Sequence, residues 1–413
     1  MGWIDKLLGK KPPARRARLA VNMDDGFSDW PAGGSSPRDR HTGDREEVLR
    51  QSLLAWQTNP LARRVVELTS QYVVGGGLRL ECDHPGTQAF LRQWWEHPLN
   101  RMDVRCVEWC DELSRAGELF VLISTAADGM SYLRAVPAGQ VREIRSAEND
   151  LEQEQEYVEI SGGEERVWPA WDPNRDDALP YQPVMQHYAV NRPVGALRGE
   201  SDLAPLLRWL SRYSAWLEDR VRLNRFRQAF LYQVKAAFSS EQERLNRQQA
   251  LNAQPPSPGS ILVTDEGENW SVIQPQLAAH EAGEDGLAIK RMVAAGAGIP
   301  LHFLAEPEGA TRTTAEFAGG PTFRRYEQRQ RYFLWMLTDL ARVALARKAR
   351  VNRRVRPDAE VIVRGADIST RDNAVLAASA REIVEAFLPL MERGLVDGAE
   401  LRRLAYRFAG EAA

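Results

Sequence analysis

The sequence has few cysteines, no long apolar run and little net charge. Three cysteines in 413 residues are too few for a disulfide framework, which favours a reducing compartment. No apolar run approaches the roughly 20 residues that cross a bilayer, so we expect no membrane partner. The formal net charge of −3 does not by itself indicate a nucleic-acid partner, although charge of one sign can still gather locally.

Motifs for catalysis and for tight phosphate binding are missing as well. The run Gly75-Gly-Gly77 is not followed by Lys-Ser or Lys-Thr, so we interpret it as a turn rather than a phosphate loop. Gly-x-Ser-x-Gly and His-Glu-x-x-His do not occur. Gly296 and Gly298 resemble a fragment of a dinucleotide fingerprint, but they end an expected helix instead of opening one.

One group of residues is compatible with a metal site. Cys106 and Cys110 have the i, i+4 spacing that puts two side chains on one helix face, and His97 and Cys82 lie not far away. No Cys-x-x-Cys or His-x-x-x-His accompanies them, as a structural zinc site would need. Because a free cysteine usually packs as a small hydrophobe, we favour core packing and predict no metal, no cofactor, no catalytic residue and no enzyme activity.

Apolar periodicity predicts a helix-rich α+β chain. Residues 1–45 carry the basic cluster Lys10, Lys11, Arg15, Arg16 and Arg18 and little apolar surface, which predicts a flexible, solvated arm that could contact nucleic acid. Helical patterns follow from Arg45. The region 117–190 has alternating strands, including a hairpin around Asp128-Gly129 and strands on both sides of the acidic run 148–156. It is mostly antiparallel, not doubly wound.

The second half of the sequence predicts long helices around a small insert. Apolar residues recur every three or four positions over 203–234 and again over 280–297, with Ser201 or Asp202 as the N-cap of the first helix. The insert 235–279 contains a short helix and strands at 261–263 and 270–273. A long helix covers 316–350, and Gly319-Gly-Pro321 should kink or restart it. A strand at 360–364 and a helical tail over 369–413 follow, with a break at Leu388-Pro-Leu390 and Gly394 as C-cap.

The segment 298–315 is a Gly-, Pro- and Thr-rich loop between two of these helices. Its candidate functional residues are Glu308, Thr311, Arg312, Thr313 and Thr314, and Arg312 is its only cation. Within its Thr-rich part, Thr313 with Glu316 fits a capping box.

The strongest basic run consists of Arg347, Lys348, Arg350, Arg353, Arg354 and Arg356. These side chains can face DNA or acidic neighbours such as the run 148–156. We favour neighbours or solvent, because charge runs usually form solvated faces.

Several local patterns, taken in order, resemble the portal proteins of tailed bacteriophages. The chain contains Asn59-Pro-Leu-Ala-Arg-Arg-Val65 followed by Val73-Val-Gly-Gly-Gly77, then Leu197-Arg-Gly-Glu-Ser-Asp-Leu203 and Leu223-Asn-Arg-Phe-Arg-Gln-Ala-Phe230. Lys290-Arg-Met-Val-Ala-Ala-Gly-Ala-Gly-Ile-Pro300 and Thr311-Arg-Thr-Thr-Ala-Glu316 come later. Each pattern is weak alone, and their joint order over residues 45–350 carries the resemblance.

The resemblance implies a ring, typically a dodecamer, at one capsid vertex. It assigns 1–45 to an N-terminal arm, 46–202 and 351–368 to a wing, 203–234 and 280–297 to two stem helices, and 235–279 to a clip. It assigns 298–315 to a tunnel loop, 316–350 to a kinked tunnel helix and 369–413 to a helical crown. In the tunnel loop it implies a light phosphate contact from Arg312 and the threonine hydroxyls, which is compatible with the capping box. For Arg312 alone, an ion pair between subunits is as well supported as DNA contact. The implied function is passage of double-stranded DNA without sequence specificity during packaging and ejection.

The implied partners are other virion components. They are the terminase large subunit, adaptor and tail proteins, and the major capsid and scaffolding proteins. The clip acids Glu241, Glu243, Asp265 and Glu266 are the residues that we expect to dock a partner. The implied location is the virion, with the host cytoplasm during assembly.

Two other classes of function stay open. One is a different capsid morphogenesis protein, such as an adaptor, although adaptors are usually far shorter and lack two long helices around an insert. The other is a hydrolase with its site in the α+β region, for which the sequence offers no nucleophile–base pair.

Overall fold

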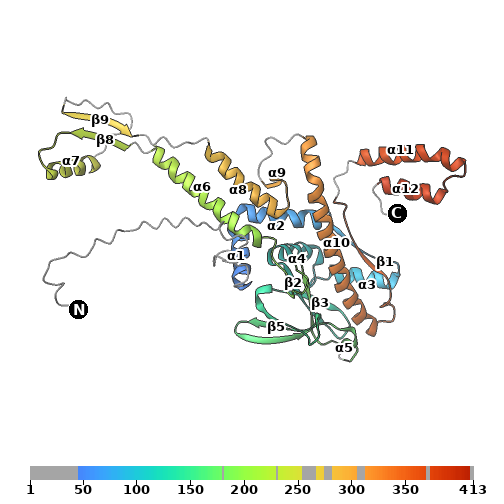
Figure 1. Cartoon of the computed structure of the whole chain (residues 1–413). Coiled ribbons are helices and arrows are strands. Elements are labelled where there is room, and N and C mark those ends of the chain that lie inside the picture. Colours follow the sequence, from blue (N-terminus) through green and yellow to red (C-terminus); the bar gives the residue numbers. More distant parts are fainter. Residues whose placement is uncertain are drawn as a thin grey trace, which may run out of the picture. The chain divides into compact units, whose positions relative to one another are not determined.

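The computed structural model describes residues 45–178, 181–228, 231–253, 267–273, 281–304, 312–368 and 373–409. The chain forms two compact units, Met1–Val48 and Leu49–Ala413. Only the start of helix α1 (Arg45–Thr58) is described in the first unit, so the predicted arm lies outside the described residues. The second unit is helix-rich with small antiparallel sheets (Figure 1), which confirms the predicted α+β class.

Capping residues, prolines and a glycine set the ends of three helices near the start of the second unit. Helix α2 (Pro60–Val73) has Asn59 as N-cap, whose Oδ1 accepts from the backbone N–H of Leu61 at 2.9 Å. Helix α3 (Pro85–Glu96) also starts with proline, and helix α4 (Met102–Ala116) ends at Gly117, which has φ of 79°. A glycine tolerates that left-handed conformation, so the chain can turn directly into the strand that begins at Glu118.

Two three-stranded antiparallel sheets follow. The order β3–β2–β7 joins β2 (Glu118–Thr125), β3 (Ser131–Val136) and β7 (Val184–Ala189). Phe120 pairs with Val136, which confirms the predicted hairpin. The order β4–β5–β6 joins β4 (Val141–Ala147), β5 (Asp150–Ser161) and β6 (Glu164–Pro169). Much of the expected acidic connection 148–156 is therefore strand, because β5 pairs its exposed start with β4.

The apolar side chains form three buried clusters. The largest contains side chains from α3, α4, β2, β3 and α10 (Arg312–Val351), among them Trp94, Leu113, Val121 and Phe333. The second lies between α2, α6 (Leu207–Gln228), α8 (Glu281–Ala297) and α10, and contains Leu206. The third fills the space between the two three-stranded sheets. Sheet β1–β10 links β1 (Leu78–Cys82) to β10 (Val361–Gly365), a strand that the sequence predicted.

The first long helix is shorter than expected. The predicted helix 203–234 is a 3₁₀ turn η2 (Ala204–Leu206), then α6, and then strand β8 (Leu231–Ala236). The run 231–236 alternates apolar and polar residues, and its pairing with β9 (Glu268–Ile273), Val234 opposite Trp270, decides for strand. Helix α7 (Glu241–Ala253) lies between these strands in the sequence. Helices α6 and α8 pack against each other (Figure 1). The strand predicted at 261–263 lies outside the described residues.

The loop before the last long helix is also shorter than expected. Helix α9 (Leu301–Leu304) and the start of α10 at Arg312 both fall within the predicted loop 298–315. Helix α10 runs without interruption through Pro321, so the expected restart is wrong. A proline removes one helical hydrogen bond. On its C-terminal side Thr322 Oγ1 donates to the carbonyl of Gly298 at 3.2 Å, and Tyr326 is buried, which holds the helix in place.

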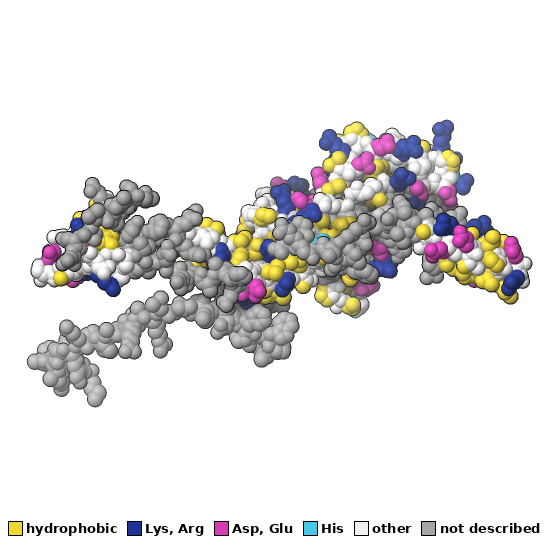
Figure 2. Space-filling model, turned by 90° about the horizontal axis from the view of Figure 1, so that it is seen from above, with side chains coloured by type: hydrophobic (Ala, Val, Ile, Leu, Met, Phe, Trp, Pro, Cys, Tyr) yellow, Lys and Arg dark blue, Asp and Glu magenta, His cyan; other side chains and the backbone are white. Residues whose placement is uncertain are grey.

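The C-terminal segment is a helical hairpin of α11 (Asn373–Glu392) and α12 (Gly398–Ala409). Helix α11 passes through Pro389, where the sequence predicted a break. Its end is as predicted. Gly394 has φ of 71°, and Leu395 N–H donates to the carbonyl of Leu390, which is a Schellman ending. Hydrophobic side chains lie among charged ones on this hairpin, at the right of Figure 2. No helix among the described residues is long and apolar enough to span a bilayer.

Candidate functional site

The predicted tunnel-loop residues fall on both sides of the boundary of the described chain. Glu308 and Thr311 lie outside the described residues. Arg312, Thr313 and Thr314 form the first turn of α10, where the structure describes only the backbone. Thr313 is thus inside the helix and not at its N-cap, so the capping box expected from Thr313 and Glu316 is wrong by about two positions.

Two of the four predicted docking acids are described, and both lie exposed on α7. Glu241 forms an ion pair with Arg244 at 2.5 Å. Glu243 accepts from Ser239 N–H at 2.9 Å, while its own N–H donates to Ser240 Oγ at 3.2 Å. These reciprocal bonds cap the helix. The Ser239 hydroxyl and the Ser239 N–H, which both donate to the Glu243 carboxylate, hold its pKa below the usual value. Asp265 and Glu266 lie outside the described residues.

An ion pair connects helix α7 to the sheet of β8 and β9. The Arg247 guanidinium donates through Nε and Nη2 to the two oxygens of Glu268, each at 3.0 Å, and Trp270 Nε1 donates to the same carboxylate at 3.1 Å. A bidentate contact fixes orientation as well as distance. Helix α7 itself has no buried residue. This contact therefore orients the helix on β9.

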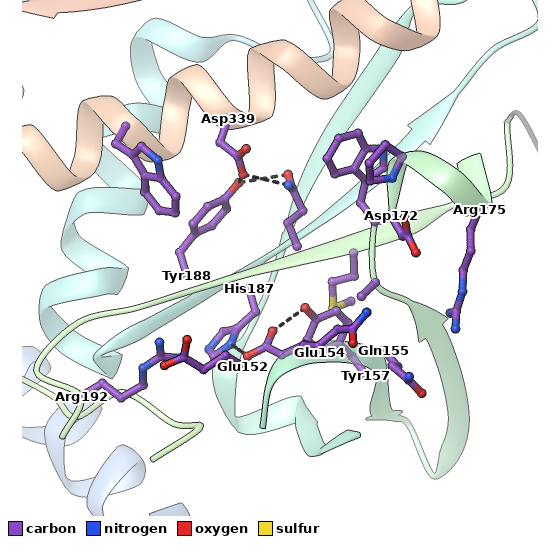
Figure 3. A pocket seen from close by; sticks show the side chains of 17 residues that line it. Glu152, Glu154, Gln155, Tyr157, Asp172, Arg175, His187, Tyr188, Arg192 and Asp339 are labelled. Atoms are coloured by element: carbon purple, nitrogen blue, oxygen red, sulfur yellow. Dashed lines mark hydrogen bonds and ion pairs between the residues drawn. The ribbon is translucent and has the colours of Figure 1, made fainter. Parts of the chain in front are cut away.

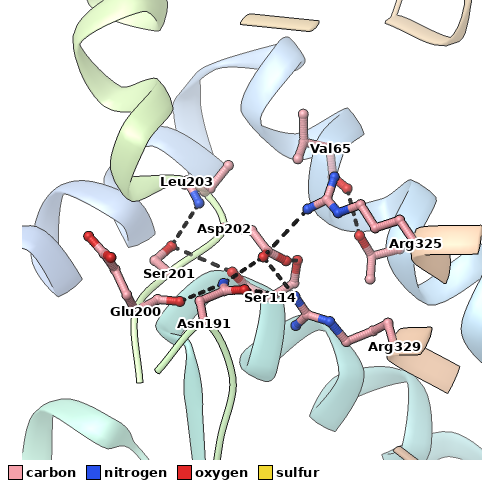
Figure 4. A network of polar contacts seen from close by, with 10 residues as sticks. Val65, Ser114, Asn191, Glu200, Ser201, Asp202, Leu203, Arg325 and Arg329 are labelled. Carbon is pink, nitrogen blue, oxygen red and sulfur yellow. Dashed lines mark hydrogen bonds and ion pairs between the residues drawn. The ribbon is translucent and has the colours of Figure 1, made fainter. Parts of the chain in front are cut away.

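Asp202 is the centre of a buried polar network (Figure 4). Its carboxylate accepts from Ser114 Oγ at 2.6 Å, from Asn191 Nδ2 at 2.8 Å and from Arg329 Nη2 at 2.8 Å. Arg325 adds an ion pair at 3.6 Å. Asp202 was expected to be an N-cap. Instead it joins α4, the loop after β7 and α10, and Ser201 Oγ accepts from Leu203 N–H in a local turn.

The basic run at the end of α10 divides into buried and exposed members. Arg347 is fully buried and contacts Asp176, on helix α5 (Pro173–Ala178), at 2.7 Å. Arg350 also contacts Asp176, at 3.3 Å. Lys348 donates to the carbonyl of Asp128 at 2.8 Å. For Arg347 the favoured acidic neighbour is confirmed, but it is the buried carboxylate of Asp176 on α5 and not the acidic run 148–156.

A cavity of about 400 Å³ lies between β5, β7 and α10. His187 lines the cavity and lies between two carboxylates. Its Nδ1 is 2.8 Å from Glu154 (Figure 3), and its Nε2 is 3.2 Å from Glu118. The imidazole stacks on Phe120 with ring centroids 4.4 Å apart. Burial lowers the pKa of His187, although Glu154 opposes that shift. A neutral ring has one N–H, and the closer carboxylate, Glu154, is its acceptor.

The opposite wall of the cavity is aromatic. Tyr188 and Gln186 both donate to Asp339 Oδ2 at 2.9 Å, and burial raises the pKa of the Tyr188 phenol well above its ordinary value. Trp335 is 54% exposed at the rim, edge-on to Tyr188 with centroids 5.9 Å apart. Glu154 and Asp339 are thus hydrogen-bonded within the chain, and Trp335 presents an exposed indole at the rim.

The cysteines do not form a metal centre among the described residues. Cys106 and Cys110 are buried in the largest apolar cluster, and burial raises the pKa of both thiols. The described part of the chain contains no group of three or more His, Cys, Asp or Glu that could hold a metal ion. The prediction of core packing for these two cysteines is confirmed.

Sequence reasoning missed the three polar clusters. Asp202 stands in the quoted pattern Leu197–Leu203, but a serine and an aspartate before an apolar run also look like a cap. Arg347 and Asp176 are separated by 171 positions, and nothing in a single sequence links them. No strand was predicted around His187, and its contacts with Glu154 and Glu118 join segments that are far apart in the sequence.

Comparison with solved structures shows which proteins have a similar fold. No family model and no curated protein matches the chain. Among solved structures, a chain of the neck of the native gene transfer agent (GTA) particle, solved with C12 symmetry, matches with a TM-score of 0.57 and 14% identity, over 92% of this chain and 98% of that one. A chain of the virion of the native GTA particle matches with the same TM-score and identity, over 88% and 94%.

A third solved structure is more distant. The crystal structure of an HK97 family phage portal protein from Corynebacterium diphtheriae matches over 75% of this chain with a TM-score of 0.39 and 11% identity, a similarity on which we base no argument. The two GTA matches extend over nearly the whole of both chains. This chain therefore shares its fold with a protein of the neck of the gene transfer agent particle.

Proposed function

We propose that the chain is a portal protein, which forms a ring at one capsid vertex through which double-stranded DNA is packaged and ejected. The observation that carries the proposal is the fold shared with a protein of a C12-symmetric particle neck over 92% of this chain. The resemblance of the sequence patterns to portal proteins supports it independently. No second function has comparable support.

The described elements refine the parts that the resemblance implies. We assign the wing to 46–202 and 351–368, the stem to α6 and α8, and the clip to the insert between them, with β8, α7 and β9. The tunnel loop then lies between α9 and α10, α10 is the long tunnel helix, and α11 with α12 forms the crown. In this arrangement the packed pair α6–α8 presents the insert at one end.

The charge of the chain suits a channel. Tight binding to duplex DNA comes from many phosphate contacts, and such contacts would oppose sliding. The formal net charge is −3, and in α10 Arg325, Arg329 and Arg347 are already paired with carboxylates. Arg312 at the start of α10 is our proposed weak phosphate contact, repeated once in each subunit.

The proposed partners and location follow from the same role. The clip, including Glu241, Glu243, Asp265 and Glu266, docks the terminase large subunit during packaging and adaptor or tail proteins afterwards. The major capsid and scaffolding proteins surround the ring, in the host cytoplasm during assembly and then in the virion. The chain is not an enzyme in this proposal.

Negative-stain or cryo-electron microscopy of the purified full chain, alone and co-expressed with the capsid and scaffolding proteins of its virus, tests the proposal. The expected particle is a closed ring with a central hole of about 20–40 Å, since a duplex needs roughly 20 Å. A chain that stays monomeric at micromolar concentration and forms no ring with those proteins would refute it.

Deleting residues 308–313 tests the tunnel-loop assignment separately. Ring assembly should persist, because these residues precede the packed part of α10, while DNA packaging or genome retention should fall. A deletion variant that packages and retains DNA normally contradicts the assignment of these residues to the channel.

A further inference from the structure

Helix α10 carries an exposed stripe of arginines around one tryptophan. Arg324, Arg331, Trp335 and Arg342 follow at intervals of seven, four and seven residues, and all four are exposed. Eighteen residues are five turns at 3.6 residues per turn, so the stripe lies on one side of the helix and is roughly 27 Å long. We call these four residues the α10 stripe.

The residues of the α10 stripe do not contribute to the apolar core. The buried side of α10 supplies Phe333, Met336 and Leu340 to the core. Other arginines of α10 are used within the chain, since Arg329 pairs with Asp202 and Arg347 with Asp176. By contrast, Arg324, Arg331 and Arg342 have no carboxylate partner in the part of the chain that the structure describes. Trp335 is 54% exposed, and the contact with Tyr188 holds its indole in place.

Helix α4 has a face of the opposite character. Val104 and Val107 are 59% and 41% exposed, and the exposed acids Asp103 and Glu108 lie beside them. We call these four residues the α4 patch. Helix α2 contacts both α4 and α10, and the α10 stripe and the α4 patch are two different surfaces carried by two different helices.

We propose that in the ring the α10 stripe of one copy docks on the α4 patch of the next copy. This inference rests on the proposed function, because a closed ring is built from heterologous contacts in which two different patches of one chain meet. The two surfaces match in kind. The arginines meet acids, and the indole meets exposed valines. Tryptophan and arginine are also the side chains most enriched where interface energy concentrates.

Duplex DNA is the competing occupant of an arginine stripe. DNA contact would use the cations alone and would leave the exposed indole and the α4 patch without a role. A contact between copies uses both surfaces of the chain, and we therefore favour it.

Charge reversal on each side tests the contact in the full chain. Arg331→Glu and Glu108→Arg are made separately, and Arg92→Glu on the exposed face of α3 is the control for a changed net charge. All three residues are exposed, so circular dichroism and thermal unfolding should be unchanged. Mass photometry measures the protein concentration at which half of the chains are in rings. Because like charges across an interface are costly, each reversal should raise this concentration by at least about tenfold, and Arg92→Glu should not.

The decisive step is to mix the two reversed variants. Each interface in an alternating ring then pairs a reversed stripe with a reversed patch, or a native stripe with a native patch. Rings should return in the mixture, and also in a single chain that carries both reversals. Rescue in the doubly reversed chain does not depend on an even number of subunits.

Other outcomes separate the explanations. If the wild-type chain forms rings and both single reversals assemble normally, the contact is wrong and the proposed ring stands. If Arg331→Glu rings assemble normally but retain less duplex DNA, the stripe faces DNA and the contact between copies is overturned. If the wild-type chain forms no ring with its capsid proteins, the proposed function itself fails.

Discussion

The Arg347 guanidinium and the Asp176 carboxylate lie 2.7 Å apart where neither side chain reaches solvent. Arg347 also donates to Thr125 Oγ1 and to the carbonyl of Gln182. One side chain thus joins α10 to α5 and to the end of β2. Such a pair is costly to break, because removing one partner leaves a buried charge uncompensated.

We therefore expect Arg347→Met to lower the free energy of unfolding by about 3–5 kcal/mol. The matched control is Arg353→Met in the same basic run, where the side chain is exposed and the change should stay within about 0.5 kcal/mol. Urea unfolding followed by circular dichroism measures both. Equal stability of the two variants would show that the buried pair contributes no net stability.

A second prediction concerns the Asp202 network. Asp202→Asn keeps the shape but removes the negative charge that faces Arg325 and Arg329, so the unfolding free energy should fall by about 3–5 kcal/mol. Asp219→Asn on α6 is the control, because the ion pair between Asp219 and Arg222 is largely exposed, and such pairs contribute about 0–1 kcal/mol. An Asp202→Asn variant as stable as this control contradicts the central role of the carboxylate.

The turn between α4 and β2 gives a third prediction. Gly117 has φ of +79°, and a Cβ there would lie 2.2 Å from the carbonyl carbon of Glu200. Gly117→Ala should destabilise the chain by at least about 2 kcal/mol, through strain and displacement of the neighbouring backbone. Gly139→Ala is the control, since a Cβ there meets nothing within 4 Å. A thermal melt of each variant measures the difference, and a Gly117→Ala melt like that of Gly139→Ala rules out the close approach.

The buried imidazole predicts a pH dependence. Burial lowers the pKa of His187 in the folded chain, so the unfolded chain binds its proton first. Stability should be full above the ordinary histidine pKa and should fall as the pH drops below about 6.5, by up to ~1.4 kcal/mol per pH unit.

In His187→Asn the amide can still donate to Glu154 but does not titrate, so this part of the pH dependence should disappear. Unfolding free energies between pH 5 and 8 measure the slope for both proteins. If the wild-type chain instead gains stability on acidification through this range, the imidazole is charged in the folded state and our assignment of the neutral form is wrong.

The two described acids of α7 should respond differently to reversal. Glu243 caps the helix, so Glu243→Lys should loosen the first turn of α7. Among the described residues Glu241 binds only Arg244, on the surface, so Glu241→Lys is the cleaner probe of the proposed docking and should weaken binding to the terminase or adaptor protein. Biolayer interferometry with assembled rings measures this, and unchanged affinity for both partners would exclude Glu241 from the docking surface.

The sequence predicted best where one local pattern determined one structure. Gly394 ends a helix and the hairpin around Asp128-Gly129 forms, both as expected. Prediction from the sequence failed where one pattern was compatible with both a helix and a strand. Residues 231–236 satisfy a helical stripe and a strand equally, and only the pairing with β9, some 35 residues later, decides. The partners of Asp202, His187 and Arg347 depend on contacts between distant segments, which a single sequence does not contain.

Sheet β1–β10 pairs Leu78 with Gly365 and so joins two segments that are far apart in the sequence. Among the described residues β10 is the only strand that pairs with β1, and Val361 and Val363 complete the largest apolar cluster. A chain that ends before residue 361 therefore exposes both an unpaired strand edge and an unfilled core, two features that make it prone to aggregate.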